Sequence, residues 1–378
     1  MKMKCIEECC EILDSMRIPI TATERKTGKY PYYGANGIQD YVEDYIFDDE
    51  LVLLAEDGGN FGSKDKPIAY RVSGKCWVNN HAHVLKPQKD IDVDYLCYSL
   101  MFYDVKGIIN GATRQKLTQA AMRKMKIPVR AMEEQLKIVE KLSKVIGIKE
   151  KRKQELKYLD ELIKARFVEM FGDININDKK WEIQPLGEIC TIVRGGSPRP
   201  IEKFLGGDIP WIKIGDATDG DSIYLNSTKE HIIQEGVKKS RLIKKGSLIF
   251  ANCGVSLGFA RIITFDGCIH DGWLAMENID NKINKVFLLQ SLNQMTERFR
   301  MMAPAGTQPN LNTTIMRAYK QIIPPLALQH EYIEFCNQID KSKVIPENQL
   351  KNIAILLTIC STIYINMNGK MGRVLYDN

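Results

Sequence analysis

Several hallmarks of common protein classes are missing from this chain of 378 residues. Its ten cysteines include no C-x-x-C pair, so we expect reduced thiols rather than zinc ligands or a disulfide framework. The charged N-terminal segment 1–10 lacks the apolar centre of a secretory signal peptide. The longest apolar stretch, Ile353–Ile365, is too short to span a bilayer. Together these absences predict a cytoplasmic protein with no membrane partner.

Sequence signatures of catalysis are absent as well. The chain has no G-x-x-x-x-G-K-[ST] phosphate-binding loop, which excludes a P-loop ATPase site. It has neither an Asn-Pro-Pro-Tyr-like motif nor the glycine-rich cofactor fingerprint of an amino-methyltransferase. We therefore expect no catalytic residue and no cofactor on this chain.

Two histidines keep an enzymatic alternative open. His81 and His83 lie two residues apart, and on a strand they would share one face, so both could ligate a metal ion in a metal-dependent nuclease. No matching set of Asp, Glu or His accompanies them in the sequence. This favours a structural or base-contacting role for the pair, and we expect no metal.

The charge of the chain is modest and evenly distributed. The net charge is +6, and residues 1–129 carry 18 basic and 18 acidic side chains. Because no half of the chain is basic overall, nucleic-acid binding would have to depend on local patches.

What the sequence does contain is an internal repeat. A shift of 194 residues places 113–162 on 307–356 without a gap, and eleven of these 50 positions are identical. Upstream the register changes to 196, where Ala55 matches Ala251 and Trp77 matches Trp273, and to 180 near the start. A period near half the chain indicates duplicated domains rather than a solenoid. Such a protein has two equivalent surfaces and can hold two copies of a partner.

The repeat divides the chain into four segments and predicts an α+β fold. Residues 131–171 contain no proline and one glycine, and their apolar residues recur at spacings of three and four. This predicts an amphipathic helix of roughly 60 Å. Residues 326–366 predict a second helix, kinked or broken at Pro346. We expect the two helices to pair as an antiparallel coiled coil. The predicted segments are a first β-rich module (1–129), a central helical spacer (130–172), a second module (173–324) and a distal helical spacer (325–378).

Short β-like runs and glycine turns alternate within both modules. Leu51–Ala55, Trp77–Leu85 and Leu248–Ala251 are rich in apolar residues that favour strands. The segments 34–37 and 58–60 carry glycine and asparagine, which favour turns.

Stretches without acidic residues occupy matching places in the repeat, at 105–132 and 298–330. Both hold Arg or Lys beside amide and hydroxyl side chains, a combination suited to DNA phosphates and base edges. A third such stretch, 236–265, belongs to the second module alone. The candidate DNA-binding residues are Tyr32, Asn36, Asn79, Asn80, His81, Thr113, Arg114, Gln115, Lys116, Arg123, Lys124, Lys126, Arg194, Arg199, Lys213, Lys238, Lys239, Arg241, Thr307, Gln308, Asn310, Asn312, Arg317 and Lys320.

Motifs in both halves give the chain its resemblance to a known family. The second module opens with Pro185-Leu186-Gly187-Glu188-Ile189-Cys190 and continues with Gly207-Asp208-Ile209-Pro210-Trp211-Ile212. The first contains Lys29-Tyr30-Pro31-Tyr32-Tyr33-Gly34 and Asn79-Asn80-His81-Ala82-His83-Val84, and Gly306-Thr307-Gln308-Pro309-Asn310-Leu311 stands near the end of the second. With these motifs the chain resembles the specificity subunit of a type I restriction–modification enzyme.

The resemblance implies a division of labour among subunits. The modules would be two target recognition domains, each recognising one half of a split sequence in double-stranded DNA. The helices would set the spacing of the half-sites and dock two modification (methyltransferase) subunits, and through that complex the restriction (endonuclease and translocase) subunits. S-adenosylmethionine would be bound by the modification subunits, and ATP and Mg by the restriction subunits. The specificity subunit of a type IIB-like system is the alternative within this class, and an interaction protein without DNA specificity is the alternative outside it.

Overall fold

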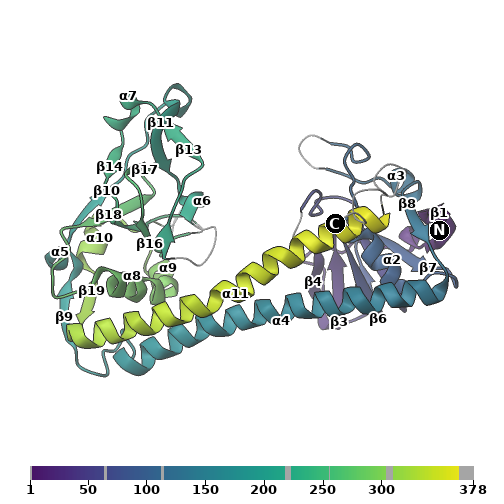
Figure 1. Ribbon diagram of the computed structural model, residues 1–378, viewed down its shortest axis with the longest axis horizontal. Helices are drawn as coiled ribbons and strands as arrows, with labels where there is room; N and C mark the ends of the chain where they lie inside the picture. The colour runs from purple at the N-terminus through teal and green to yellow at the C-terminus, as the bar shows by residue number, and fades with distance from the viewer. Residues whose placement is uncertain are drawn as a thin grey trace, which may run out of the picture. The chain divides into compact units, whose positions relative to one another are not determined.

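The computed structural model describes residues 2–63, 66–111, 115–217, 223–254, 256–303 and 310–365. The chain forms two compact units, one made of Met1–Leu156 with Val344–Asn378 and the other of Lys157–Lys343. Each unit combines a β-rich module with one end of each of two long helices, α4 (Met132–Phe171) and α11 (Leu326–Ile365) (Figure 1). The mixed helix and strand content confirms the predicted α+β class.

A six-stranded sheet makes up most of the first unit. Its strand order is β2-β7-β5-β6-β3-β4, and all neighbours are antiparallel except β3 and β6. A separate two-stranded ribbon joins β1 to β8. The elements of this module are β1 (Lys2–Cys5), α1 (Ile6–Cys9), β2 (Cys10–Ile12), η1 (Asp14–Met16), β3 (Thr27–Gly34), β4 (Gly37–Val42), β5 (Phe47–Ala55), β6 (Ala69–Val78), β7 (Ala82–Pro87), α2 (Val93–Leu100), α3 (Gln119–Arg123) and β8 (Lys126–Val129).

The second unit also combines mainly antiparallel sheets with a two-stranded ribbon, but its strands form two sheets instead of one. Its sheets are ordered β10-β18-β15-β16-β12 and β13-β11-β17-β14, and β19 pairs with β9. The elements are β9 (Glu182–Pro185), α5 (Leu186–Ile189), β10 (Thr191–Arg194), η2 (Ile201–Lys203), β11 (Leu205–Ile212), α6 (Ile214–Ala217), β12 (Tyr224–Leu225), β13 (Glu230–Ile232), α7 (Gln234–Val237), β14 (Arg241–Ile243), β15 (Leu248–Ala251), β16 (Ala260–Ile263), β17 (Gly267–Ile269), β18 (Trp273–Glu277), α8 (Lys285–Gln294), α9 (Thr296–Met302), α10 (Thr313–Ala318) and β19 (Lys320–Ile323).

Strand pairing shows which elements correspond. Tyr32 of β3 lies beside Trp77 of β6 in a parallel pair, and Trp211 of β11 lies beside Cys268 of β17 in another. The long strand β6 of the first unit thus corresponds to two shorter strands, β16 and β17, in the second. This division is one reason why the second unit has two main sheets where the first has one.

The same pairing corrects one match inferred from the sequence. Trp77 and Trp273 are not equivalent, because Trp77 lies in β6 whereas Trp273 begins β18, the counterpart of β7. Ala55 pairs with Ala82, and its counterpart Ala251 pairs with Trp273, so Trp273 corresponds to Ala82. The predicted run Trp77–Leu85 is likewise two strands, with residues 79–81 forming the loop between them.

Each module is built around one strand that is buried on both faces. Leu51–Ala55 of β5 and Leu248–Ala251 of β15 are fully buried, as their continuous apolar runs predict. Because side chains alternate along a strand, Val52 and Leu54 contribute to one hydrophobic core and Leu51 and Leu53 to another. The strand therefore serves as the shared wall of two cores.

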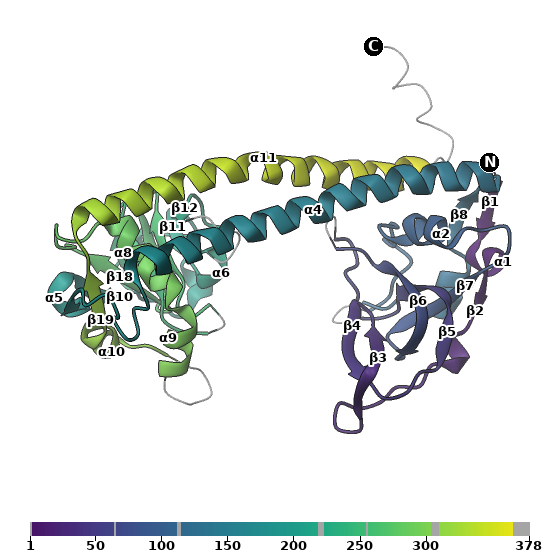
Figure 2. The same ribbon diagram turned by 90° about the horizontal axis from the view of Figure 1, so that it is seen from below.

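The predicted long helices are confirmed. Helix α11 continues through Pro346 as one helix, so the predicted break does not occur there, and a kink at Pro346 stays a prediction. Within the second unit the helices run antiparallel: Asp160 pairs with Lys343 at 2.6 Å, and Arg166, further along α4, pairs with Glu331, further back on α11, at 2.7 Å (Figure 2). No helix among the described residues is long and apolar enough to cross a membrane.

Aromatic side chains secure the helices of the second unit to their module. Phe167 and Phe171 of α4 lie 5.4 and 5.5 Å, between ring centroids, from Tyr332 of α11. Both phenylalanines also contact Phe287 of α8, at 5.9 and 4.9 Å. All four rings are almost fully buried, and edge-to-face pairs of this kind stabilise a core beyond the area they bury.

A buried glutamine joins each module to the first turn of its following helix. In the first unit, Gln135 Oε1 accepts from the backbone N–H of Asp92 at 2.9 Å, and its Nε2 donates to the carbonyls of Asp90 and Arg130. In the second, Gln329 Oε1 accepts from Asn284 N–H at 2.7 Å, and its Nε2 donates to Lys282 and Pro324. Both side chains are fully buried. The shift of 194 residues therefore preserves a complete three-bond contact.

We expect Gln329→Ala to lower the free energy of unfolding of the second unit by about 3 kcal/mol, because it leaves one N–H and two carbonyls without their partner. Chemical denaturation followed by fluorescence measures this change. Gln338→Ala, an exposed glutamine on the same helix, is the matched control and should change stability by less than about 0.5 kcal/mol. Equal effects of the two substitutions would contradict this role for Gln329.

Candidate nucleic-acid interface

Backbone and side-chain hydrogen bonds bring four loops of the first module together. We call these the first-unit loop cluster: residues 35–36, 56–60, 79–81 and 115–119. Asn36 Nδ2 donates to the carbonyl of Gly58 at 2.9 Å, and Glu56 N–H donates to that of His81 at 2.9 Å. Leu117 N–H donates to the carbonyl of Glu56 at 2.7 Å. Segments distant in the sequence thus form one polar surface element.

The candidate residues in this cluster divide into exposed and buried ones. Asn36, Asn80, Gln115 and Lys116 are exposed, and His81 is one-third exposed. Asn79 is buried, and its side chain is fully engaged: Nδ2 donates to Gln39 and Oδ1 accepts from the backbone N–H of His81. The exposed group can meet DNA directly, whereas Asn79 shapes the loop that carries His81.

Tyr32 is a core residue in this structure. Its ring is 1% exposed, and the Arg25 guanidinium lies 4.3 Å from the ring centroid. Its hydroxyl contacts the backbone of Ile20. Tyr32 therefore has no exposed face for a base, and its contribution is to hold the preceding loop.

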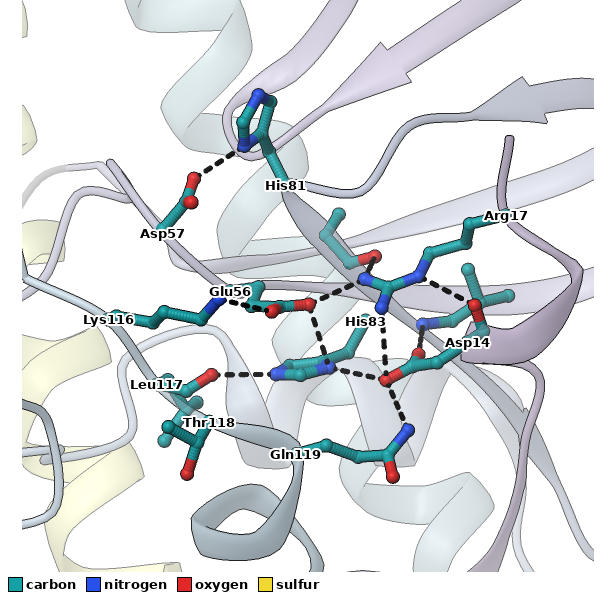
Figure 3. Close-up of polar contacts among 12 residues, drawn as sticks. Asp14, Arg17, Glu56, Asp57, His81, His83, Lys116, Leu117, Thr118 and Gln119 are labelled. Atoms are coloured by element: carbon teal, nitrogen blue, oxygen red, sulfur yellow. Dashed lines mark hydrogen bonds and ion pairs between the residues drawn. The ribbon is translucent and has the colours of Figure 1, made fainter. Parts of the chain in front are cut away.

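Beneath the exposed residues lies a network of charged side chains (Figure 3). Glu56 accepts from Arg17 at 2.6 Å and from Lys116 at 3.0 Å. Asp14 accepts from His83 at 2.7 Å and from Gln119 at 2.8 Å. Burial raises the pKa of Asp14, but hydrogen bonds from His83 and Gln119 outweigh it and hold that pKa below its usual value.

This network does not support the metal-nuclease alternative. Asp14, Glu56 and His83 bring three ligand-type atoms within 4.8 Å of one another. However, Arg17 and Lys116 already pair with these carboxylates, and both ring nitrogens of His83 face hydrogen-bond acceptors. His81 is turned elsewhere, with its Nδ1 2.6 Å from Asp57. The two histidines thus serve separate contacts.

The second unit assembles the corresponding loops, which we call the second-unit loop cluster: residues 194–199, 252–253, 270–272 and 310–312. Asn252 N–H donates to the carbonyl of Gly272 at 2.9 Å, and Leu311 N–H donates to that of Asn252 at 2.8 Å. These two bonds repeat those of Glu56 and Leu117. Gly58 and its counterpart Gly254 both have positive φ angles, 60° and 72°, that favour glycine in this turn.

The side chains of the second-unit loop cluster are different. Asn252 Nδ2 donates to Asn310 Oδ1 at 3.2 Å. The Asp271 carboxylate accepts a hydrogen bond from the Ser197 hydroxyl at 2.8 Å and pairs with Arg199 at 3.6 Å. The backbone carbonyl of Asp271 accepts from Arg194 Nε. The two clusters therefore share a backbone frame and present unlike chemical groups.

The remaining basic candidates of the second unit lie outside this cluster. Lys238, Lys239 and Arg241 are exposed, and Lys239 lies over the ring of Phe204. Lys213 pairs with Glu230 and lies over the ring of Trp211.

Acid-free stretches of sequence are not acid-free in space. The fold brings Glu56 to Lys116 and Glu7 to Arg123, the latter at 3.9 Å. Arg317, the counterpart of Arg123, donates to the carbonyl of Ile192.

Lys124, Lys126 and Lys320 are exposed, and no ion pair joins them to another described residue. Asn312 Oδ1 accepts from the N–H of Ile315 and caps α10. Thr113, Arg114, Thr307 and Gln308 lie outside the described residues.

Sequence reasoning missed the residues that hold these loops in place. Asp14, Arg17, Glu56 and Gln119 were not candidates, because they lie in four separate segments with no shared motif. A signal did exist for Gln135 and Gln329, since both are identities of the repeat.

Comparison with known proteins decides the family. The family model described as "Type I restriction modification DNA specificity domain" matches residues 1–158 and 178–354. The chain belongs to this family. It is thus a DNA sequence-specificity subunit of the type I restriction–modification kind, as its motifs predicted, and the nuclease alternative gains no support.

Individual relatives cover most of this specificity subunit. A candidate type I restriction enzyme specificity subunit of Haemophilus influenzae is 28% identical over 349 residues, 90% of this chain and 88% of the relative. The MjaIX specificity subunit of Methanocaldococcus jannaschii is 26% identical over 54% of this chain and 48% of its own length. The S subunit structure from M. genitalium matches with a TM-score of 0.52 at 14% identity, covering 96% of both chains. A structure on assembly and conformational transition of the type I R-M system matches with a TM-score of 0.56 at 15% identity, covering 97% of this chain and 96% of that chain.

We expect Lys124→Ala to weaken DNA binding roughly three- to tenfold for all sequences and to reduce the salt slope by about one, as loss of a phosphate contact should. Titration at several salt concentrations measures both quantities. Lys124→Arg is the control and should retain the slope. A change in base preference at an unchanged slope would show instead that Lys124 contacts a base.

Proposed function

We propose that each module of this specificity subunit recognises one half of a bipartite sequence in double-stranded DNA through its loop cluster. The observation that carries this proposal is that both loop clusters repeat one set of backbone hydrogen bonds. Leu117 N–H donates to the Glu56 carbonyl, and Leu311 N–H donates to the Asn252 carbonyl at the equivalent position, while the side chains around them differ. The shared backbone arrangement suits binding of the same kind of ligand, DNA, by both modules. The different side chains suit recognition of different base sequences.

The two long helices support a second part of the proposal, the docking of two modification subunits. Tyr158 and Leu162 of α4 are 61% and 46% exposed. Leu356, the counterpart of Leu162 under the shift of 194 residues, is 44% exposed. Equivalent exposed apolar side chains on two repeats suit two copies of one partner.

Catalysis then belongs to the partners. We assign S-adenosylmethionine to the modification subunits, and ATP and Mg to restriction subunits that join through the same complex, in the cytoplasm. The absence of catalytic motifs from the sequence supports a chain that recognises DNA and catalyses nothing.

Exchange of residues 1–129 for those of a relative tests the two-module proposal. We expect one half of the methylated sequence to change and the other half to stay, because residues 173–324 recognise the second half independently. Sequencing of methylated positions in a host that expresses the exchanged subunit shows the outcome. If both halves change, or neither does, the proposal fails.

A cleavage assay tests the assignment of catalysis. The purified chain with Mg²⁺ should leave DNA intact, and His81→Ala should behave like the unaltered chain. Metal-dependent cleavage by the chain alone that disappears in His81→Ala would overturn this assignment.

A further inference from the structure

His83 lies on β7 with its ring completely buried and each ring nitrogen opposite an acceptor (Figure 3). Nε2 is 2.9 Å from the carbonyl oxygen of Leu117, which can only accept, so Nε2 carries a proton. Nδ1 is 2.7 Å from Asp14 Oδ2 and 3.6 Å from Glu56 Oε2. Asp14 also accepts from Gln119 and from the backbone of Val84, as an ionised carboxylate does. The ring thus bridges the Asp14 carboxylate on one side and the Leu117 carbonyl on the other.

Two acidic and two basic side chains surround the ring. Asp14 of η1 and Glu56 after β5 place two carboxylates against the ring, and Arg17 and Lys116 approach the same carboxylates from the outside. The ring lies between η1 and two segments of the first-unit loop cluster, because Glu56 belongs to segment 56–60 and Leu117 to segment 115–119.

The second unit holds the equivalent segment without charge. Strand pairing places Leu274 at the position of His83, and the shift of 196 residues places Asn252 at that of Glu56. Leu274 packs in the hydrophobic core, and Asn252 contacts Asn310 through a neutral hydrogen bond. The chain thus contains a version of the same frame without the buried histidine.

We propose that His83 is a positioning residue for DNA recognition by the first unit, where its buried ring fixes segment 115–119 within the loop cluster. This inference rests on the proposed function and adds to it the residue on which one half-site depends. Loss of the ring removes the donor to the Leu117 carbonyl and the contact that ties it to Asp14. Segment 115–119 then shifts, and recognition of the first half-site fails while the second persists.

The test uses the complex with its modification subunits and three DNA duplexes: the full site, one with the first half scrambled and one with the second half scrambled. For His83→Leu we expect the affinity ratio between the full site and the first-half-scrambled duplex to fall about tenfold or more. The ratio for the second half should stay unchanged. Asn252→Ala is the matched control and should affect the second half only.

A rescue distinguishes positioning from general destabilisation. The double variant Glu56→Asn with His83→Leu introduces the pair found in the second unit, so it should regain most of the first-half ratio. A nitrogen-15 NMR spectrum of histidine-labelled protein should show a proton on Nε2 of His83, because this nitrogen faces the Leu117 carbonyl. This spectrum tests the inference even if His83→Leu does not fold.

The possible results separate the two proposals. Unchanged first-half recognition in His83→Leu, failure of the rescue, or an Nε2 without a proton in the unaltered protein overturns the role of His83 alone. No difference between the full and scrambled sites in the unaltered complex overturns the proposed function itself.

Discussion

The contact on which each unit depends is the buried glutamine at the start of its long helix. Gln135 and Gln329 each satisfy one backbone N–H and two backbone carbonyls from the module and from the strand that leads into the helix. A carboxamide is suited to this position because it supplies an acceptor and two donors without charge, so burial costs little once all three bonds form. The angle between a module and its own helix end is thereby fixed in both repeats. This explains why the shift of 194 residues holds without a gap through this region.

The side chains that differ between the two modules lie in their loop clusters. The loop clusters keep the backbone bonds that join Leu117 to Glu56 and Leu311 to Asn252, but Glu56 lies in a charged network, whereas Asn252 makes a neutral hydrogen bond to Asn310. Backbone bonds constrain where a loop lies and leave its side chains free, so such a frame can present new groups to DNA without a new fold. We propose that recognition and assembly in this way use different faces of the same module.

The sequence alone could predict much of the fold. Long elements with one clear period, namely both helices and the buried run Leu248–Ala251, were predicted within a residue or two. Pro346 was expected to kink or break α11, and the break is absent, because packing can outweigh one missing N–H. The candidate site was harder to predict. Asp14, Glu56 and His83 meet only after three strands pair, and the acids opposite Lys116 and Arg123 come from distant segments. Charge in the sequence indicates a patch only where the fold brings no counter-charge to it.

The central claim is that one chain with two equivalent frames recognises one DNA sequence in two parts. Single-molecule sequencing of DNA methylation, in a host that expresses this chain with its modification subunits, tests it most directly. The account predicts a single methylated motif made of two short specified blocks, unlike each other in sequence and separated by unspecified bases of fixed number. A continuous motif without a gap, or methylation with no sequence preference, would contradict it.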